Sequence, residues 1–114
     1  MTPPPTDIPG VRRVDLQRHD LSAPGREVIQ NRVEISPEAP ATRHFHPGEE
    51  VIYVLEGTIK YEIDGEPAQM VQTGEVLTVP AERVHSAKNI GTAQAAELAT
   101  YIVEKGKPLV TVAD

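Results

Sequence analysis

Residues 44–50 of this chain read His-Phe-His-Pro-Gly-Glu-Glu, and a further histidine, His85, follows in a later segment. Imidazole nitrogen and carboxylate oxygen are donor atoms that divalent transition metals select. Alternate side chains of a β-strand point to the same face, so His44 and His46 would lie side by side. The proline and glycine would then turn the chain and bring Glu50 back to the same place. The pattern predicts a metal site formed by His44, His46, Glu50 and His85.

The identity of the carboxylate ligand depends on where the second strand begins. If it begins at once, Glu50 points inward together with Ile52 and Val54, and Glu49 is a solvated charge. A register shifted by one residue would make Glu49 the ligand instead. The remaining histidine, His19, lies outside both clusters, and its simplest interpretation is a solvated residue.

Length and composition limit the classes of protein that this chain can be. Its 114 residues suffice for one domain, and no apolar run approaches the roughly 20 residues needed to span a bilayer. The net charge of -6 argues against nucleic acid as a partner, because affinity for phosphates comes mainly from lysine and arginine. The absence of cysteine excludes thiolate ligands, so a metal site can contain only nitrogen and oxygen donors. No signal peptide is recognisable at the start, so we expect a cytoplasmic protein without a membrane role.

The hydrophobic pattern indicates an all-β protein. Residues 1–10 hold four of the eleven prolines, which predicts a short extended tail before a single domain over 11–114. From Arg26 onward, short β-rich runs alternate with Gly, Pro and Asp, as in the turn at 64–66. The runs predict eight or nine strands, at about 27–36, 41–47, 50–56, 58–64, 68–72, 75–79, 83–90, 95–104 and 108–112. So many short strands favour a closed barrel or jelly roll, because closure removes exposed edges.

Two segments, at about 44–57 and 74–89, resemble the two sequence motifs of the cupin superfamily. The first motif, G-x5-H-x-H-x3-4-E-x6-G, is matched at His44, His46, Glu50 and Gly57. The second, G-x5-P-x-G-x2-H-x3-N, is matched at Gly74, Pro80, His85 and Asn89. Two positions depart from the motifs, because Glu38 and Glu82 replace glycines. Both are turn positions, so the departures concern loop geometry rather than the ligands.

The resemblance implies a cupin double-stranded β-helix, or jelly-roll barrel, over about residues 26–112. It also implies that His44, His46, Glu50 and His85 bind one divalent transition-metal ion inside the barrel. The ion could be Fe, Mn, Ni, Zn or Cu, because ligand types alone do not select among them. Turns and core contacts explain the other matched residues, which are Gly57, Gly74, Pro80 and Asn89.

Cupins include enzymes of several classes, binding modules and storage proteins, so the motifs leave the reaction open. The leading hypothesis is a dioxygenase-type oxidoreductase acting on a small organic molecule, because open metal positions can hold substrate and dioxygen together. Glu50 would be the catalytic group, able to alternate between ligation and proton abstraction. One alternative is an isomerase or lyase acting on a sugar or an organic acid. Another is a module that binds or senses a small molecule without catalysis.

Several further residues are candidates for the pocket or the surface. Asn31 and Tyr61 occupy inward positions of their strands, where each could contact a pocket ligand or belong to the core. Tyr53 and Arg83 are expected at the surface or a subunit interface. Single-domain cupins commonly pair, and pairing would cover an exposed strand such as 51–55, so we expect a homodimer.

Overall fold

The computed structural model describes residues 8–113, which form ten β-strands and no helix. Among these residues there is consequently no helix with the length and apolarity that crossing a membrane would require. The strands are β1 (Val11–Asp20), β2 (Arg26–Ile35), β3 (His44–Phe45), β4 (Gly48–Glu56), β5 (Thr58–Ile63), β6 (Gln69–Gln72), β7 (Val76–Val79), β8 (His85–Asn89), β9 (Ala95–Glu104) and β10 (Thr111–Val112).

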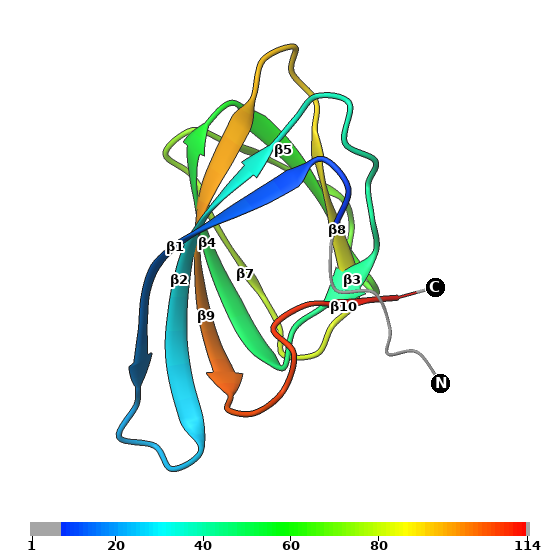
Figure 1. Ribbon diagram of the computed structural model, residues 1–114. Coiled ribbons are helices and arrows are strands. Elements are labelled where there is room, and N and C mark those ends of the chain that lie inside the picture. The colour runs from blue at the N-terminus through cyan, green and yellow to red at the C-terminus, as the bar shows by residue number, and fades with distance from the viewer. Residues whose placement is uncertain (1–7, 114) are drawn as a thin grey trace.

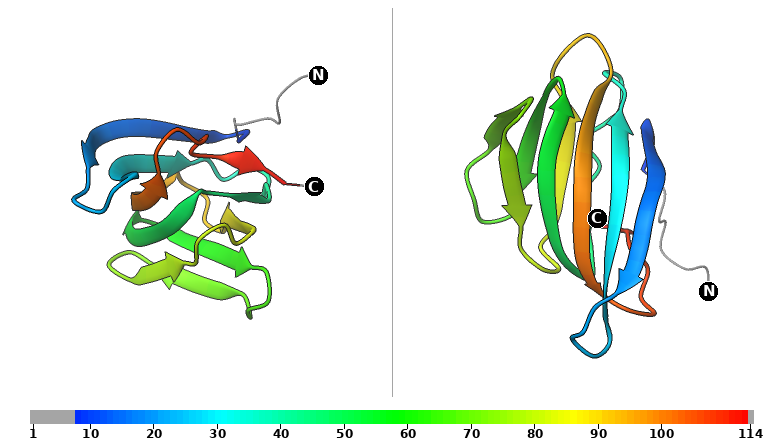
Figure 2. Two further views of the ribbon diagram at one scale, coloured as in Figure 1. Left: turned by 90° about the horizontal axis from the view of Figure 1, so that it is seen from below. Right: turned by 90° about the vertical axis from the view of Figure 1, so that its left-hand side faces the viewer.

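The strands form two five-stranded sheets that face each other as a jelly-roll barrel (Figure 1). The first sheet has the order β1-β2-β9-β4-β7, and Figure 2 shows these strands side by side in its right-hand view. The second sheet has the order β10-β3-β8-β5-β6. Every pairing is antiparallel. The pairs β1–β2 and β5–β6 are consecutive along the chain, whereas the other neighbours come from more distant segments. The all-β jelly-roll prediction is therefore confirmed.

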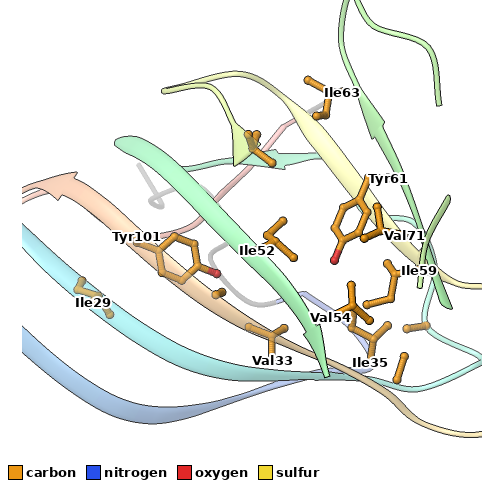
Figure 3. Packing of buried hydrophobic residues seen from close by; sticks show 14 of the residues in the cluster. Ile29, Val33, Ile35, Ile52, Val54, Ile59, Tyr61, Ile63, Val71 and Tyr101 are labelled. Atoms are coloured by element: carbon orange, nitrogen blue, oxygen red, sulfur yellow. The ribbon is translucent and has the colours of Figure 1, made fainter. Parts of the chain in front are cut away.

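The core lies between the two sheets. Strand β2 alternates buried and half-buried side chains over most of its length, with Val33 and Ile35 on the inner face. The opposite sheet contributes Ile59 and Tyr61 from β5, and Figure 3 shows these side chains packed with the inner residues of the first sheet. Apolar alternation with period two thus directs one face of each sheet into a shared interior.

The hairpins and strand ends agree with the turn residues of the sequence. The predicted turn at 64–66 joins β5 to β6, and Gly65 adopts a φ of 85°, in the left-handed region that glycine tolerates. Strand β7 ends directly before Pro80, as predicted. Strand β9 has the predicted bounds, 95–104, although its first half is rich in alanine.

Strand β1 is a ten-residue strand that the sequence patterns did not predict. It pairs with β2 from Val11 opposite Ile35 to Asp20 opposite Glu27, with a bulge between Asp15 and Gln17. Most of its side chains are exposed or half-buried, because it is the edge strand of the first sheet. Because an edge strand is largely exposed, its sequence need not alternate apolar and polar residues. Strand β1 is therefore defined by its pairing with β2.

The predicted extended tail, residues 1–10, lies mainly outside the described residues. Of its last residues, Pro9 and Gly10 form a turn that leads into β1. The backbone carbonyl of Gly10 accepts a hydrogen bond of 3.1 Å from the N–H of Ser36. This end of the predicted tail is therefore joined to the loop that follows β2.

The second motif departure, Glu82, has a φ of 60°, and it is the one non-glycine residue with positive φ among those described. A side chain in this conformation costs roughly 1–2 kcal/mol. We expect Glu82→Gly to raise the free energy of unfolding by about 0.5–1 kcal/mol, since glycine removes this strain but adds entropy to the unfolded chain. Urea denaturation of the metal-free protein measures the change.

Glu38→Gly is the matched control for this prediction. Glu38 also occupies a motif glycine position, but its φ is not positive. Glycine there relieves no strain, so we expect a loss of about 0.5–1 kcal/mol. A loss of stability in both variants would contradict the claim that Glu82 is strained.

Candidate metal centre

The four predicted ligands come together inside the barrel. His44 begins β3, His46 follows that strand, Glu50 lies on β4 and His85 begins β8. All four are buried, with exposed fractions of 6%, 2%, 4% and 2% in that order. His44 and His85 are direct partners across the β3–β8 pairing. The site therefore draws residues from both sheets.

The four side chains direct donor atoms toward one point. The ligand atoms of His44, His46 and His85 all lie within 4.8 Å of one another. Oε1 of Glu50 lies 3.2 Å from Nε2 of His46 and 3.2 Å from Nε2 of His85. A single ion placed among these atoms could be reached by three imidazoles and one carboxylate.

Backbone carbonyls orient the three imidazole rings. Nδ1 of His44 lies 2.8 Å from the carbonyl oxygen of Thr42, and Nδ1 of His85 lies 2.9 Å from that of Arg83. Nδ1 of His46 lies 2.7 Å from the carbonyl oxygen of Leu109. Because a carbonyl can only accept, each Nδ1 carries the proton. Each neutral ring then presents the Nε2 lone pair to the site.

The donor atoms of the site carry electron pairs, which need a cation or a hydrogen-bond donor as their partner. Nε2 of His46 and Nε2 of His85 are buried and have no hydrogen-bond partner among the described residues. With the carboxylate of Glu50 they would form a buried set of electron-pair donors facing each other, which is unfavourable without a cation between them. A divalent transition metal satisfies all of them, and the residues therefore fit such an ion.

Protonation of the ligands is consistent with metal binding. Burial, followed by the charges of His85 and His46, lowers the pKa of His44 to about 3, so its ring is neutral at neutral pH. Burial alone would raise the pKa of Glu50, but positive charge on His46 and His85, together with hydrogen bonds from these rings, outweighs burial and holds that pKa well below its usual range. This lowering belongs to protonated rings, and a metal ion on the Nε2 atoms would supply the positive charge in place of those protons. Glu50 is accordingly an anionic ligand.

The register of β4 decides between the two adjacent glutamates. Glu50 lies opposite Tyr101 on one side and Val79 on the other, and both of these side chains are buried in the interior. Glu49 is exposed. The structure thus places Glu50 beside the three histidines and Glu49 at the surface, which is the register expected if Glu50 is the ligand.

A small cavity adjoins the ligands. Its volume is about 20 Å³, room for about one or two water molecules. Tyr61 lines this cavity and also belongs to the hydrophobic core, so the core role is confirmed and contact with a pocket ligand stays a prediction. The described lining consists of Ile8, Val11, Arg13, Val33, Ile35, Thr42, His44, Glu50, Tyr61, His85, Ala87 and Glu97.

Asn31 is buried but is not among the described residues of the cavity wall. Its Nδ2 donates hydrogen bonds of 3.1 Å to Oδ1 of Asp15 and 3.1 Å to the carbonyl oxygen of Gln30. These partners lie on β1 and β2, where the strands pair beside the bulge. Asn31 thus makes core hydrogen bonds through Nδ2, in line with the second of its two interpretations, while its buried Oδ1 has no partner among the described residues.

Three functional candidates were not recognised in the sequence: Glu97, Tyr101 and Arg13. Glu97 and Tyr101 lie on the inner face of β9, with exposed fractions of 3% and 0%. Alternation along that strand was the available signal, because it places both residues inward. Arg13 had no such signal, since it lies on the unpredicted strand β1.

Glu97 brings a second carboxyl group to the cavity. Burial, followed by the nearby Glu50, raises its pKa well above the usual value. Its Oε2 atom is buried without a hydrogen-bond partner among the described residues, as is the hydroxyl of Tyr61. Two polar atoms besides the ligands therefore lie in the interior beside the site.

The remaining candidates lie away from the site. His19 is exposed, and Tyr53 lies on the outer face of the first sheet with an exposed fraction of 45%. Arg83 is exposed and donates a hydrogen bond of 3.0 Å to the carbonyl oxygen of Asp64. Asn89 is structural, since its Nδ2 donates to two backbone carbonyls and its Oδ1 accepts from the N–H of Gly91. The expected homodimer stays a prediction.

Solved structures with the same fold include several cupins. The chain is similar to an oxalate oxidase in complex with glycolate, with a TM-score of 0.71 and 22% identity over 96% of this chain and 59% of that one. It is also similar to the polyketide cyclase RemF from Streptomyces resistomycificus, with a TM-score of 0.70 and 24% identity over 94% and 73% of the chains. A conserved protein of unknown function from Streptococcus pyogenes matches with a TM-score of 0.66 and 18% identity over 84% and 76%. At these identities the likeness concerns the fold.

The sequence comparisons separate the family from individual proteins. No curated protein matches this chain. The family model described as a cupin domain matches residues 31–103, which is more than half of the chain and includes all four predicted ligands. Together with the two-sheet barrel, this match shows that the chain belongs to the cupin family.

Proposed function

We propose that this chain is a metal-dependent enzyme of the dioxygenase type, acting on a small organic molecule. His44, His46, Glu50 and His85 would hold one divalent transition-metal ion. The observation that carries the proposal is the convergence of three imidazoles and one carboxylate beside a small cavity. When bound, such an ion supplies Lewis acidity and, if redox-active, electron transfer to dioxygen. Four protein donors leave room on a six-coordinate ion for other molecules.

The remaining lining residues would prepare the cavity for chemistry. Val33 and Ile35 provide apolar walls that exclude bulk water from the buried ligands. Glu50 is the catalytic candidate, because a carboxylate can exchange ligation for proton abstraction. Tyr61 presents a hydroxyl group that could donate a hydrogen bond to a bound oxygen atom.

A second reaction class, isomerisation or lyase chemistry by proton transfer, is favoured by one specific observation. The cavity holds a second carboxyl group, Glu97, beside the hydroxyl of Tyr61, and each has an unpartnered polar atom. Glu97 and Tyr61 could each hold or transfer a proton, and a bound ion could polarise a carbonyl group of the substrate. Together they suit a reaction that removes a proton from the carbon next to that carbonyl. Such a reaction would need no dioxygen.

Oxygen consumption tests the leading proposal. We expect metal-loaded protein to consume dioxygen with at least one substrate from a panel of catechols, enols and flavonols, and metal-free protein to consume none. The same panel is incubated anaerobically and analysed by mass spectrometry. Equal turnover without oxygen would replace the dioxygenase proposal with the proton-transfer class. Saturable binding without any turnover would favour a binding or sensing module.

A further inference from the structure

Arg13 introduces a positive charge into the cavity, and it is the one lysine or arginine among the described lining residues. It lies on β1 opposite Val33, whose side chain is buried in the interior. The preceding residue, Arg12, points to the other face of the sheet, where it forms an ion pair of 3.0 Å with Glu34. Two adjacent arginines therefore have different environments, one in the cavity and one outside.

Tyr101 orients the guanidinium group of Arg13. Nη1 of Arg13 donates a hydrogen bond to the hydroxyl of Tyr101, and Cζ of Arg13 lies 5.6 Å from the centroid of the Tyr101 ring. The same ring contacts His46, with 4.8 Å between the two centroids. Since Tyr101 is fully buried, it holds the guanidinium at a fixed position relative to the ligands. One phenol ring separates the cation from His46.

Most of the donors of this guanidinium remain available. A guanidinium has five N–H groups, and within residues 8–113 only Nη1 of Arg13 has a hydrogen-bond partner. Within the same residues, Arg13 forms no ion pair, although Glu50 and Glu97 line the same cavity. Glu50 and Glu97 act on the charge of Arg13 from a distance without contacting it, so an anion that reaches the free N–H groups would add a direct interaction. The planar fork of a guanidinium matches the two oxygens of a carboxylate.

We infer that the cavity takes a small organic acid, whose carboxylate is bound by Arg13 while its reacting oxygen faces His44 and His85. The enclosed volume of about 20 Å³ holds only one or two water molecules, so even a two-carbon acid would extend into the mouth of the cavity, which is partly open. The placement of the reacting oxygen beside His44 and His85 rests on the proposed function. The placement of the carboxylate rests on Arg13. A divalent ion and Arg13 together carry three positive charges, which exceed the two negative charges that Glu50 and Glu97 could carry at most, so the cavity favours an anion.

Binding of matched acids and amides tests this inference. Isothermal titration calorimetry of metal-loaded protein with glycolate and lactate, against glycolamide and lactamide, measures the contribution of the carboxylate. We expect the acids to bind at least about tenfold more tightly than the amides. Arg13→Gln should weaken the acids by about tenfold to a hundredfold and leave the amides unchanged. Arg12→Gln, the matched control, should bind the acids as the wild type does.

Elemental analysis of each variant separates this inference from the proposed function. If Arg13→Gln retains the metal and binds the acids as tightly as wild type, the inference is wrong and the metal-dependent function stands. If the wild type takes up no metal, the proposed function fails, while Arg13-dependent binding of acids would still support the inference. Failure of every acid to bind the metal-loaded wild type would also overturn it.

Arg13→Lys covers the case in which Arg13→Gln does not fold, since Arg13 contacts the core residue Tyr101. Lysine keeps the charge and loses the fork. We expect this variant to fold. Its affinity for the acids should lie between the affinity of the wild type for the acids and the affinity of the wild type for the amides. Affinity for the acids equal to that of wild type would contradict bidentate recognition.

Discussion

His85→Ala is expected to abolish stoichiometric binding of a divalent metal. His85 supplies one of three inward Nε2 atoms, and its nitrogen lies 3.2 Å from Oε1 of Glu50. Alanine leaves three donors, so we expect the affinity for Mn(II) or Zn(II) to fall by more than about a hundredfold, beyond the loss typical of residues that merely orient a ligand. Titration of metal-free protein with each ion measures the affinity, and elemental analysis measures the stoichiometry.

His19→Ala is the matched control for the loss of one imidazole. His19 is exposed, and its Nδ1 contacts the carbonyl oxygen of the neighbouring Asp20. We expect this variant to bind metal with the affinity and stoichiometry of the wild type. Full retention of metal by His85→Ala, in protein whose circular dichroism is that of the wild type, would mean that the ligand assignment is wrong.

Gly48→Ala is expected to destabilise the barrel by about 3 kcal/mol or more. A Cβ atom at this position would lie 1.9 Å from the carbonyl oxygen of Ile102 and 2.7 Å from Cα of Val103, both of which are backbone atoms of β9. Neither atom can move without separating β4 from β9 at the start of their pairing. Forced overpacking of this kind is among the few mechanisms that give large losses of stability. Thermal and urea unfolding of the metal-free protein measure the loss.

Gly91→Ala is the matched control for an added methyl group. The nearest atom to a Cβ at Gly91 is Oδ1 of Asn89 at 3.4 Å, which is ordinary contact, and φ there is not positive. We expect a change within about 1 kcal/mol. Similar losses in both variants would show that the close approach of β4 to β9 is not what requires glycine at Gly48.

The sequence predicted those parts of the fold where local pattern and burial coincide. Strand β9 was predicted with its observed bounds, because its alanine-rich first half leads into the β-favouring residues 101–103 and glycines flank the segment. The turn at Gly65 was predicted because its residues suit a positive φ. Strand β1 was not predicted, because its side chains are mostly exposed and only its pairing with β2 specifies it.

The same distinction, between local sequence pattern and long-range strand pairing, decides which residues of the site could be predicted. The spacing of His44, His46 and Glu50 carries local information, because two short elements bring these residues together. Arg13 and Glu97 reach the cavity through long-range pairing of β1, β2 and β9, which no short motif records. The metal ligands were therefore predictable from the sequence, whereas the residues that would select the substrate required the fold.

Elemental analysis of the chain, purified without added metal and then incubated separately with Fe(II), Mn(II), Ni(II), Zn(II) and Cu(II), tests the central claim most directly. The buried and unpartnered Nε2 atoms of His46 and His85, together with Glu50, predict one tightly held divalent ion per chain. A folded protein that retains none of these ions after dialysis would contradict the metal centre and the function proposed for it.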